Sequence, residues 1–60
     1  MATKALVIDD EEDYRVIIRE ILSGAGYEVR LAKDGEEGLF LLKQSPADVV
    51  LVDWMMPKMD

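Results

Sequence analysis

Apolar side chains recur along this chain with spacings that predict first a strand and then a helix. Residues 5–8 form an uninterrupted apolar run with branched side chains, as expected for a strand buried on both faces. Residues 14–25 place apolar side chains along one side of a helix, with charged side chains opposite. Gly26 stands where a left-handed cap would end this helix. Its apolar side consists of Tyr14, Ile17, Ile18, Ile21, Leu22 and Ala25.

The following residues predict a second strand, a second helix and a third strand. Residues 27–31 alternate apolar and charged side chains, which is typical of an edge strand with one face in water. Asp34, with Glu37 three residues later, resembles the capping box that starts a helix, and Pro46 ends that helix. Residues 49–52 are apolar throughout and predict the third strand. Connections this short require each helix to cross between parallel strands.

This order predicts an α/β fold, a flavodoxin-like half-domain in which residues 1–60 form one unit. We expect three parallel strands in the order 2-1-3, because right-handed crossovers then place the two helices on opposite faces. The winding reverses beside the first strand, and open α/β sheets bind ligands at such a point, outside the carboxyl ends of the strands. Asp9, Asp10 and Asp53 follow the strand ends there.

The third strand is as apolar as a central strand, yet nothing in the sequence predicts a cover for its outer edge. A flat apolar edge is a template for pairing with another chain. A chain of 60 residues without cysteine has a marginal core and no disulfide to reinforce it. We therefore expect a truncated domain, or one completed by self-association into a homo-oligomer. Val16 and Phe40, apolar residues on the polar sides of the helices, are either ordinary exposed residues or part of that interface.

Charge and composition exclude several functions. Thirteen acidic and seven basic residues give a net charge of −6, which argues against direct nucleic-acid binding. No apolar run is long enough to span a membrane, and no secretory signal begins the chain. The absence of cysteine fits a reducing compartment, so we expect a cytoplasmic protein. With neither His nor Cys, nucleophile pairs built on those residues are impossible.

Asp9, Asp10 and Asp53 would repel one another where the strand ends converge. A divalent cation removes that repulsion, and a set of oxygen ligands suits Mg²⁺, which usually takes one or two carboxylates and several waters. The alternative is that Asp9 and Asp10 cap the first helix while Asp53 caps a turn. Acids are common at junctions between strands and helices, so the spacing alone leaves both interpretations open.

Three segments resemble a response-regulator receiver domain of two-component signalling. They are LVIDDE at residues 6–11, GEEG at residues 35–38 and DVVLVDWMMPKMD at residues 48–60. They occur in the family's order and spacing, so the chain resembles the N-terminal half of such a domain. The resemblance implies that Asp53 accepts a phosphoryl group from a sensor histidine kinase or a histidine phosphotransfer protein. Asp53 would be a carboxylate nucleophile that forms an acyl phosphate.

The resemblance also implies a Mg²⁺ site. Asp10 and Asp53 match direct ligands, Asp9 matches an acid that reaches the metal through water, and Met55 matches a ligand through its backbone carbonyl. The metal would hold the phosphoryl oxygens and offset the charge that builds during transfer. The resemblance implies a signalling module and not an enzyme. A phosphatase with an aspartate nucleophile would need a second acid at position 55, which is Met.

In the receiver family, a Ser or Thr and a Lys from later strands contact the phosphoryl group, and both would follow residue 60. Without their charge-assisted contacts, we expect that this chain alone is not a working switch. We expect that it can still bind metal, and that phosphorylation is slow or absent. The alternative is a structural half-domain that pairs with a copy of itself and carries out no phosphotransfer.

Overall fold

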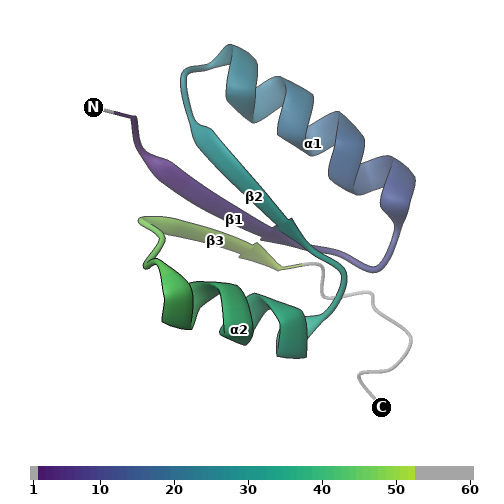
Figure 1. Cartoon of the computed structure of the whole chain (residues 1–60). Coiled ribbons are helices and arrows are strands. Elements are labelled where there is room, and N and C mark those ends of the chain that lie inside the picture. The colour runs from purple at the N-terminus through teal and green to yellow at the C-terminus, as the bar shows by residue number, and fades with distance from the viewer. Residues whose placement is uncertain (1, 53–60) are drawn as a thin grey trace.

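The computed structural model describes residues 2–52, which form three strands and two helices (Figure 1). The elements are β1 (Lys4–Ile8), α1 (Glu12–Gly24), β2 (Glu28–Ala32), α2 (Gly35–Gln44) and β3 (Val49–Val52). This confirms the predicted β-α-β-α-β order. The longer helix, α1, has 13 residues, so neither helix in the described part could cross a membrane.

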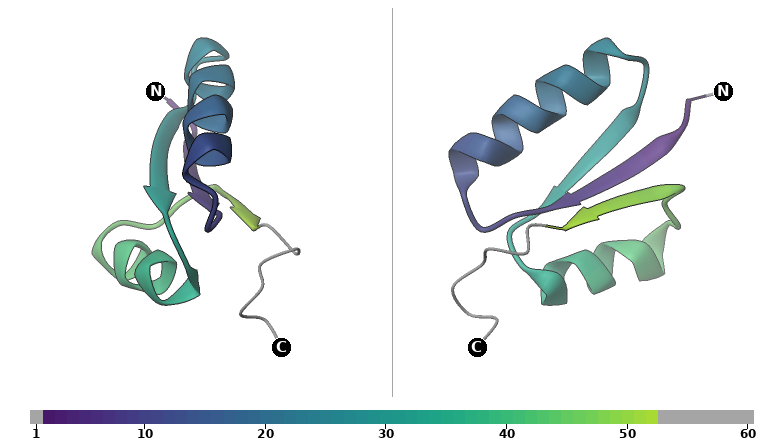
Figure 2. Two further views of the ribbon diagram at one scale, coloured as in Figure 1. Left: turned by 90° about the vertical axis from the view of Figure 1, so that its right-hand side faces the viewer. Right: turned by 180° about the vertical axis from the view of Figure 1, so that it is seen from behind.

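The three strands form a parallel sheet in the order β2-β1-β3, as predicted. In its register, Leu6 of β1 lies between Arg30 of β2 and Val50 of β3. The two helices lie on opposite faces of the sheet (Figure 2). The chain is therefore a flavodoxin-like half-domain whose winding reverses beside β1.

The core is centred on β1, whose apolar residues 5–8 are all buried. On the α2 side of the sheet, Leu6, Ile8 and Ala32 form a buried cluster that is flanked by Leu41, Leu42 and Ala47. Gly38, in α2, is also buried, which indicates a close approach between this helix and the sheet. Apolar side chains interleave here because both faces of a central parallel strand are covered by helices.

Both helices end as the sequence predicted. Gly26 has a φ of 96°, and the N–H groups of Gly26 and Tyr27 each donate at 3.0 Å, to the carbonyls of Ser23 and Leu22 respectively. This is a Schellman cap, which needs a left-handed residue that glycine adopts without strain. At the other helix, α2 ends at Gln44, directly before its C-cap and Pro46.

The predicted capping box at the start of α2 is displaced by one residue. The carboxylate of Asp34 accepts a hydrogen bond from the Glu37 N–H at 2.8 Å, as expected of an N-cap. The Glu37 carboxylate accepts from the Lys33 N–H at 2.7 Å, whereas a capping box would use the N–H of residue 34. The result still ties the β2–α2 connection to the first turn of the helix.

β2 is an edge strand, as predicted, but of the charged residues expected on its wet face only Glu28 is exposed. Arg30 is half-buried and lies on the side of the sheet that α2 covers. Its guanidinium donates to the carbonyl oxygens of Leu41 at 2.9 Å and Ser45 at 2.7 Å. A cation is favourable at these carbonyls because they form the negative end of the α2 dipole.

The apolar side of α1 is only partly covered. Ile18 and Leu22 are half-buried, but Tyr14, Ile17 and Ile21 are 58%, 53% and 65% exposed. Helical periodicity located this side correctly and did not show how much of it the sheet would cover. Val16 and Phe40 are exposed, as expected from their positions on the polar sides of the helices.

β3 is exposed along its whole length, with each of its four residues between 38% and 41% exposed. Within residues 2–52, neither helix approaches β3, and its only strand neighbour is β1. The uncovered edge that the sequence suggested is therefore present in the described part. Self-association through this edge remains a prediction.

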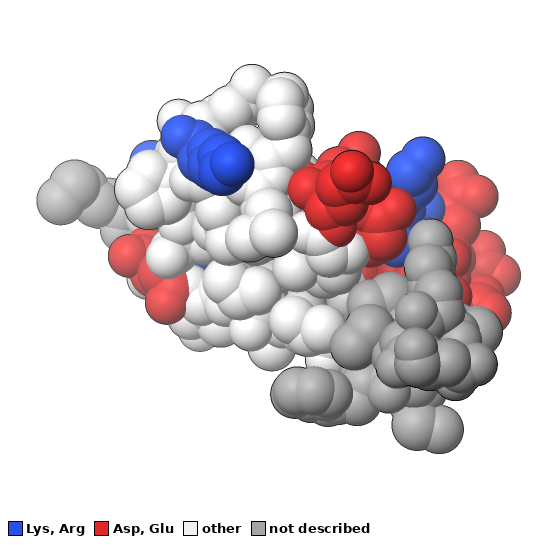
Figure 3. All heavy atoms as spheres, turned by 90° about the horizontal axis from the view of Figure 1, so that it is seen from below, with Lys and Arg blue, Asp and Glu red and all other residues white. Residues whose placement is uncertain are grey.

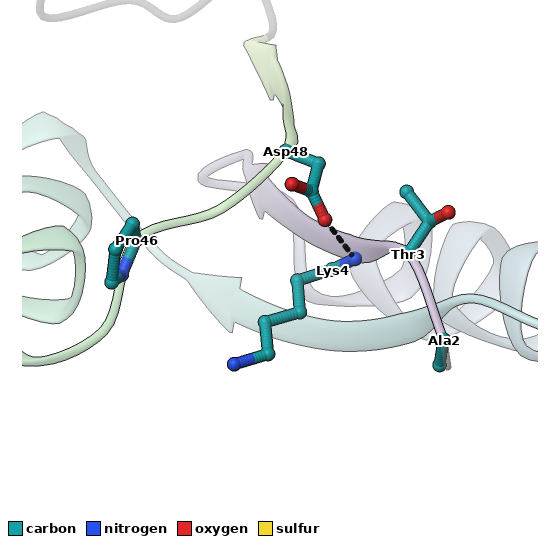
Figure 4. A pocket seen from close by; sticks show the side chains of 5 residues that line it. All are labelled: Ala2, Thr3, Lys4, Pro46 and Asp48. Atoms are coloured by element: carbon teal, nitrogen blue, oxygen red, sulfur yellow. Dashed lines mark hydrogen bonds between the residues drawn. The ribbon is translucent and has the colours of Figure 1, made fainter.

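The amino ends of β1 and β3 are joined by a reciprocal pair of hydrogen bonds, of which Figure 4 shows the one to the Asp48 carboxylate. The Lys4 N–H donates to the Asp48 carboxylate at 2.8 Å, and the Asp48 N–H donates to the Lys4 carbonyl at 2.8 Å. Ala2, Thr3 and Pro46 complete a shallow hollow around this pair. These bonds fix where β3 begins, and thereby fix which residue ends it beside β1.

Candidate functional site

Asp9 and Asp10 lie at the carboxyl end of β1, as the sequence predicted. Ile8, the residue before them, pairs with Ala32 of β2 and with Val52 of β3, so all three strands end at this level. Asp9 is only 5% exposed, and Asp10 is half-buried. The acid pair therefore occupies the point where the winding reverses, which is where ligands bind in open α/β sheets.

Asp53 and Met55 lie outside the described residues, so their predicted roles remain predictions. Asp53 is the residue after Val52 in the sequence, just as Asp9 is the residue after Ile8. Val52 and Ile8 are paired across β3 and β1. The strand register therefore ends β3 beside the acid pair, and the predicted acceptor is the next residue in the sequence.

Asp9 is held by three hydrogen bonds to different parts of the chain. Its N–H donates to the Ala32 carbonyl at 3.0 Å, which extends the β1–β2 pairing by one residue. Its carboxylate Oδ1 accepts from the Glu11 N–H at 2.9 Å. Its carbonyl oxygen accepts from the Arg15 guanidinium at 2.6 Å. These contacts fix the main chain on both sides of the Asp9 side chain.

The bond from Glu11 bears on the alternative that the acids only cap the first helix. The N-cap of α1 is Glu11, which makes no side-chain cap hydrogen bond. Asp9 instead bonds to a backbone N–H two residues later, which is the pattern of an Asx turn. Asp9 thus shapes the turn before α1 and does not cap the helix. This bond does not use the Asp10 carboxylate, which can therefore bind a ligand.

Acidic residues gather at this end of the molecule. Both helices begin here, with Glu12 and Asp13 in the first turn of α1 and Glu36 and Glu37 in the first turn of α2. Figure 3 shows most of the visible acidic atoms toward this end, with some basic atoms among them. Such a concentration of one charge attracts cations to the sheet end.

The chemistry of the acid pair fits Mg²⁺. Asp9 and Asp10 offer hard oxygen ligands, and Mg²⁺ typically takes one or two protein carboxylates while keeping several waters. Within residues 2–52, no three acidic, His or Cys residues are grouped closely enough to hold a metal by themselves. The described pair therefore fits part of a Mg²⁺ site, for which Asp53 is the predicted third carboxylate.

Sequence reasoning missed the role of Arg15. Helical periodicity placed it on the polar side of the helix, where a charged side chain needs no partner. In the structure it is half-buried and reaches back to the carbonyl of Asp9. The available signal was geometric, because helical side chains lean toward the N-terminus and can reach the preceding turn.

Comparison with known proteins agrees with the resemblance seen in the sequence. The family model described as "Response regulator receiver domain" matches residues 5–60. The chain is similar to the probable transcriptional regulator ycf27 of Guillardia theta, at 51% identity over 57 residues, covering 95% of this chain and 22% of that protein. It is 43% identical over 60 residues to the response regulator MprA of Mycolicibacterium vanbaalenii, covering 100% of this chain and 26% of that protein.

The uncharacterized transcriptional regulatory protein YrkP of Bacillus subtilis is 47% identical over 57 residues, covering 95% of this chain and 24% of that protein. The chain thus spans about a quarter of the length of these curated relatives. No solved structure matches it.

Proposed function

This chain belongs to the response regulator receiver domain family, and on that premise we propose that it carries the phosphoacceptor site of a two-component signalling protein. Asp53 is the proposed acceptor, and a sensor histidine kinase or a histidine phosphotransfer protein is the proposed donor. The observation that carries the proposal is the pairing of Ile8 with Val52, because it places the acid pair beside the strand end that leads into Asp53.

The proposed transfer needs only a carboxylate nucleophile and stabilisation of charge. An oxygen of Asp53 forms a bond to phosphorus while the phosphorus–nitrogen bond of phosphohistidine breaks, and the imidazole nitrogen takes the electron pair. Asp10 and Asp53 are the proposed direct ligands of Mg²⁺, with Asp9 acting through water and Met55 through its carbonyl. A bound Mg²⁺ supplies positive charge to the phosphoryl oxygens during transfer.

Receiver domains are signalling modules and not classical enzymes. In this proposal the chain is accordingly a phosphoprotein that is modified once, and not a catalyst that releases a product. Its net charge of −6 favours a protein partner over direct nucleic-acid contact. A cytoplasmic location is part of the proposal, because the kinase and the phosphotransfer protein act there.

We also propose that the chain self-associates through β3. The support is the exposure of all four apolar residues of this strand, on an edge that has no partner among residues 2–52. A second copy would pair its β3 with this edge, which is the standard route by which apolar edge strands are covered. Association and phosphotransfer are compatible, because the acid pair lies at the strand ends and not along the edge.

The test of phosphotransfer is intact mass after incubation with Mg²⁺ and phosphoramidate, a small donor that contains a phosphorus–nitrogen bond. We expect slow addition of one phosphoryl group, which Asp53→Ala abolishes. Asp13→Ala is the matched control, because Asp13 is an exposed acid in the first turn of α1 and has no proposed role in the site. An adduct that persists in Asp53→Ala would contradict the proposal. No adduct on the folded chain would favour the alternative, a structural half-domain that carries out no phosphotransfer.

A further inference from the structure

Arg15 connects α1 to the backbone of the acid pair. Its Nη1 donates to the carbonyl oxygen of Asp9 at 2.6 Å. Arg15 is half-buried, whereas Arg19, one turn further along the same helix, is exposed. A long charged side chain loses rotamer freedom when it is held in one place. The hydrogen bond to Asp9 must therefore offset an entropic cost.

The bonded carbonyl belongs to the peptide unit that joins Asp9 to Asp10. Because that unit is planar, the direction of its carbonyl also fixes the direction in which the chain enters Asp10. The N–H of Asp9 is fixed by Ala32, and its carboxylate by the N–H of Glu11. Arg15 supplies the remaining restraint, on the carbonyl side of Asp9.

We propose that Arg15 is a positioning residue for the acid pair, which sets the orientation of the Asp9–Asp10 peptide unit and so prepares the Asp10 carboxylate for Mg²⁺. This inference rests on the proposed function, because the metal belongs to that proposal. Arg15 acts through the main chain and contacts neither the metal nor the phosphoryl group. Its role is that of a partner that orients a ligand, and loss of such partners commonly weakens metal binding by about 10–100-fold.

The direction in which Mg²⁺ affinity changes when Arg15 is removed tests this inference. A positive charge close to a cation site opposes cation binding, so removal of Arg15 would strengthen Mg²⁺ binding if charge alone mattered. If orientation matters, removal weakens Mg²⁺ binding despite the lost repulsion. A general loss of stability would lower the melting temperature without producing a weaker Mg²⁺ affinity in the chain that remains folded.

The experiment is a Mg²⁺ titration of the 60-residue chain, followed by the fluorescence of its single tryptophan, Trp54, which neighbours Asp53 in the sequence. We expect Arg15→Met to raise the Mg²⁺ dissociation constant by about tenfold. Arg15→Lys keeps a charged donor and should recover most of the affinity. Arg19→Met is the matched control, because it removes the same charge from an exposed position on α1.

Each outcome bears on the inference. An unchanged or tighter Mg²⁺ affinity in folded Arg15→Met would overturn it while leaving the proposed function intact. An equal loss in Arg19→Met would also overturn it, because the weaker affinity would then not depend on the hydrogen bond from Arg15 to Asp9. No Mg²⁺ response in the unsubstituted chain would overturn both the proposed metal site and this inference. If Arg15→Met does not fold, Arg15→Gln, which keeps a shorter neutral donor, is expected to show the same loss.

Discussion

Gly38 of α2 lies so close to Ile8 of β1 that a Cβ atom on residue 38 would stand 2.5 Å from the Ile8 Cδ1 atom. Real Cβ atoms do not approach other heavy atoms this closely, so a side chain at residue 38 would require the buried Ile8 side chain or the helix to shift. Ile8 is also the residue directly before the acid pair. The contact between α2 and the sheet therefore supports the strand end from which Asp9 and Asp10 emerge.

Gly38→Ala is expected to destabilise the chain. Alanine is favoured over glycine in a helix by about 1 kcal/mol, but overpacking of a core costs about 1–3 kcal/mol, so we expect a net loss of about 1 kcal/mol. Urea unfolding followed by circular dichroism, at a fixed protein concentration, measures this difference. Gly35→Ala is the matched control, because nothing lies within 4 Å of a Cβ at that position, and it should be neutral or slightly stabilising. Equal stability of the two variants would contradict the close contact.

Arg30→Met tests whether the guanidinium fastens α2 to β2. The substitution keeps much of the apolar stem and removes both hydrogen bonds to the carbonyls of Leu41 and Ser45. Hydrogen bonds from charged groups contribute about 1.5–3 kcal/mol each, so we expect a loss of about 2 kcal/mol, discounted for partial exposure. Arg30→Lys retains one charged donor group, and its stability should fall between those of Arg30→Met and the unsubstituted chain. A thermal melt in which Arg30→Met matches the unsubstituted chain would show that these bonds are dispensable.

Val50→Lys tests the proposed association through β3. A lysine on an edge strand is a common natural barrier to edge pairing, and Val50 is exposed. We expect association to weaken by at least about tenfold, equivalent to about 1.4 kcal/mol. Sedimentation equilibrium measures the change, with Ser23→Lys on α1 as a control that adds the same charge elsewhere. Unchanged association in Val50→Lys would exclude β3 as the interface, and a monomeric unsubstituted chain would exclude self-association.

The order and direction of the strands could be predicted because apolar runs, helical spacing and right-handed crossovers leave few alternatives. The position of the acid pair followed from the same rules, since Asp9 and Asp10 come directly after a buried strand. The roles of Arg15 and Arg30 could not be predicted in this way. Both are long side chains that reach backbone carbonyls, and hydrophobic periodicity treats any charged residue on a helix or strand as solvent-facing.

The exposure of Ile17 and Ile21 also could not be predicted from the sequence. Periodicity marks the side of a helix that prefers burial, whereas the extent of burial depends on how much sheet lies beneath it. Both helices pack on β1 and β2, and neither approaches β3 within residues 2–52. The apolar side of α1 is therefore wider than the part of the sheet that covers it.

The central claim is that the acid pair beside the end of β3 forms a Mg²⁺ site that serves Asp53. Its most direct test is the Mg²⁺ concentration that gives half-maximal labelling by phosphoramidate, measured by intact mass for the unsubstituted chain and for Asp10→Asn. We predict that labelling requires Mg²⁺ and that Asp10→Asn shifts the half-maximal concentration upward by at least about tenfold, as expected when a carboxylate ligand loses its charge. Labelling that proceeds equally well without Mg²⁺, or an unchanged Mg²⁺ dependence in folded Asp10→Asn, would contradict it.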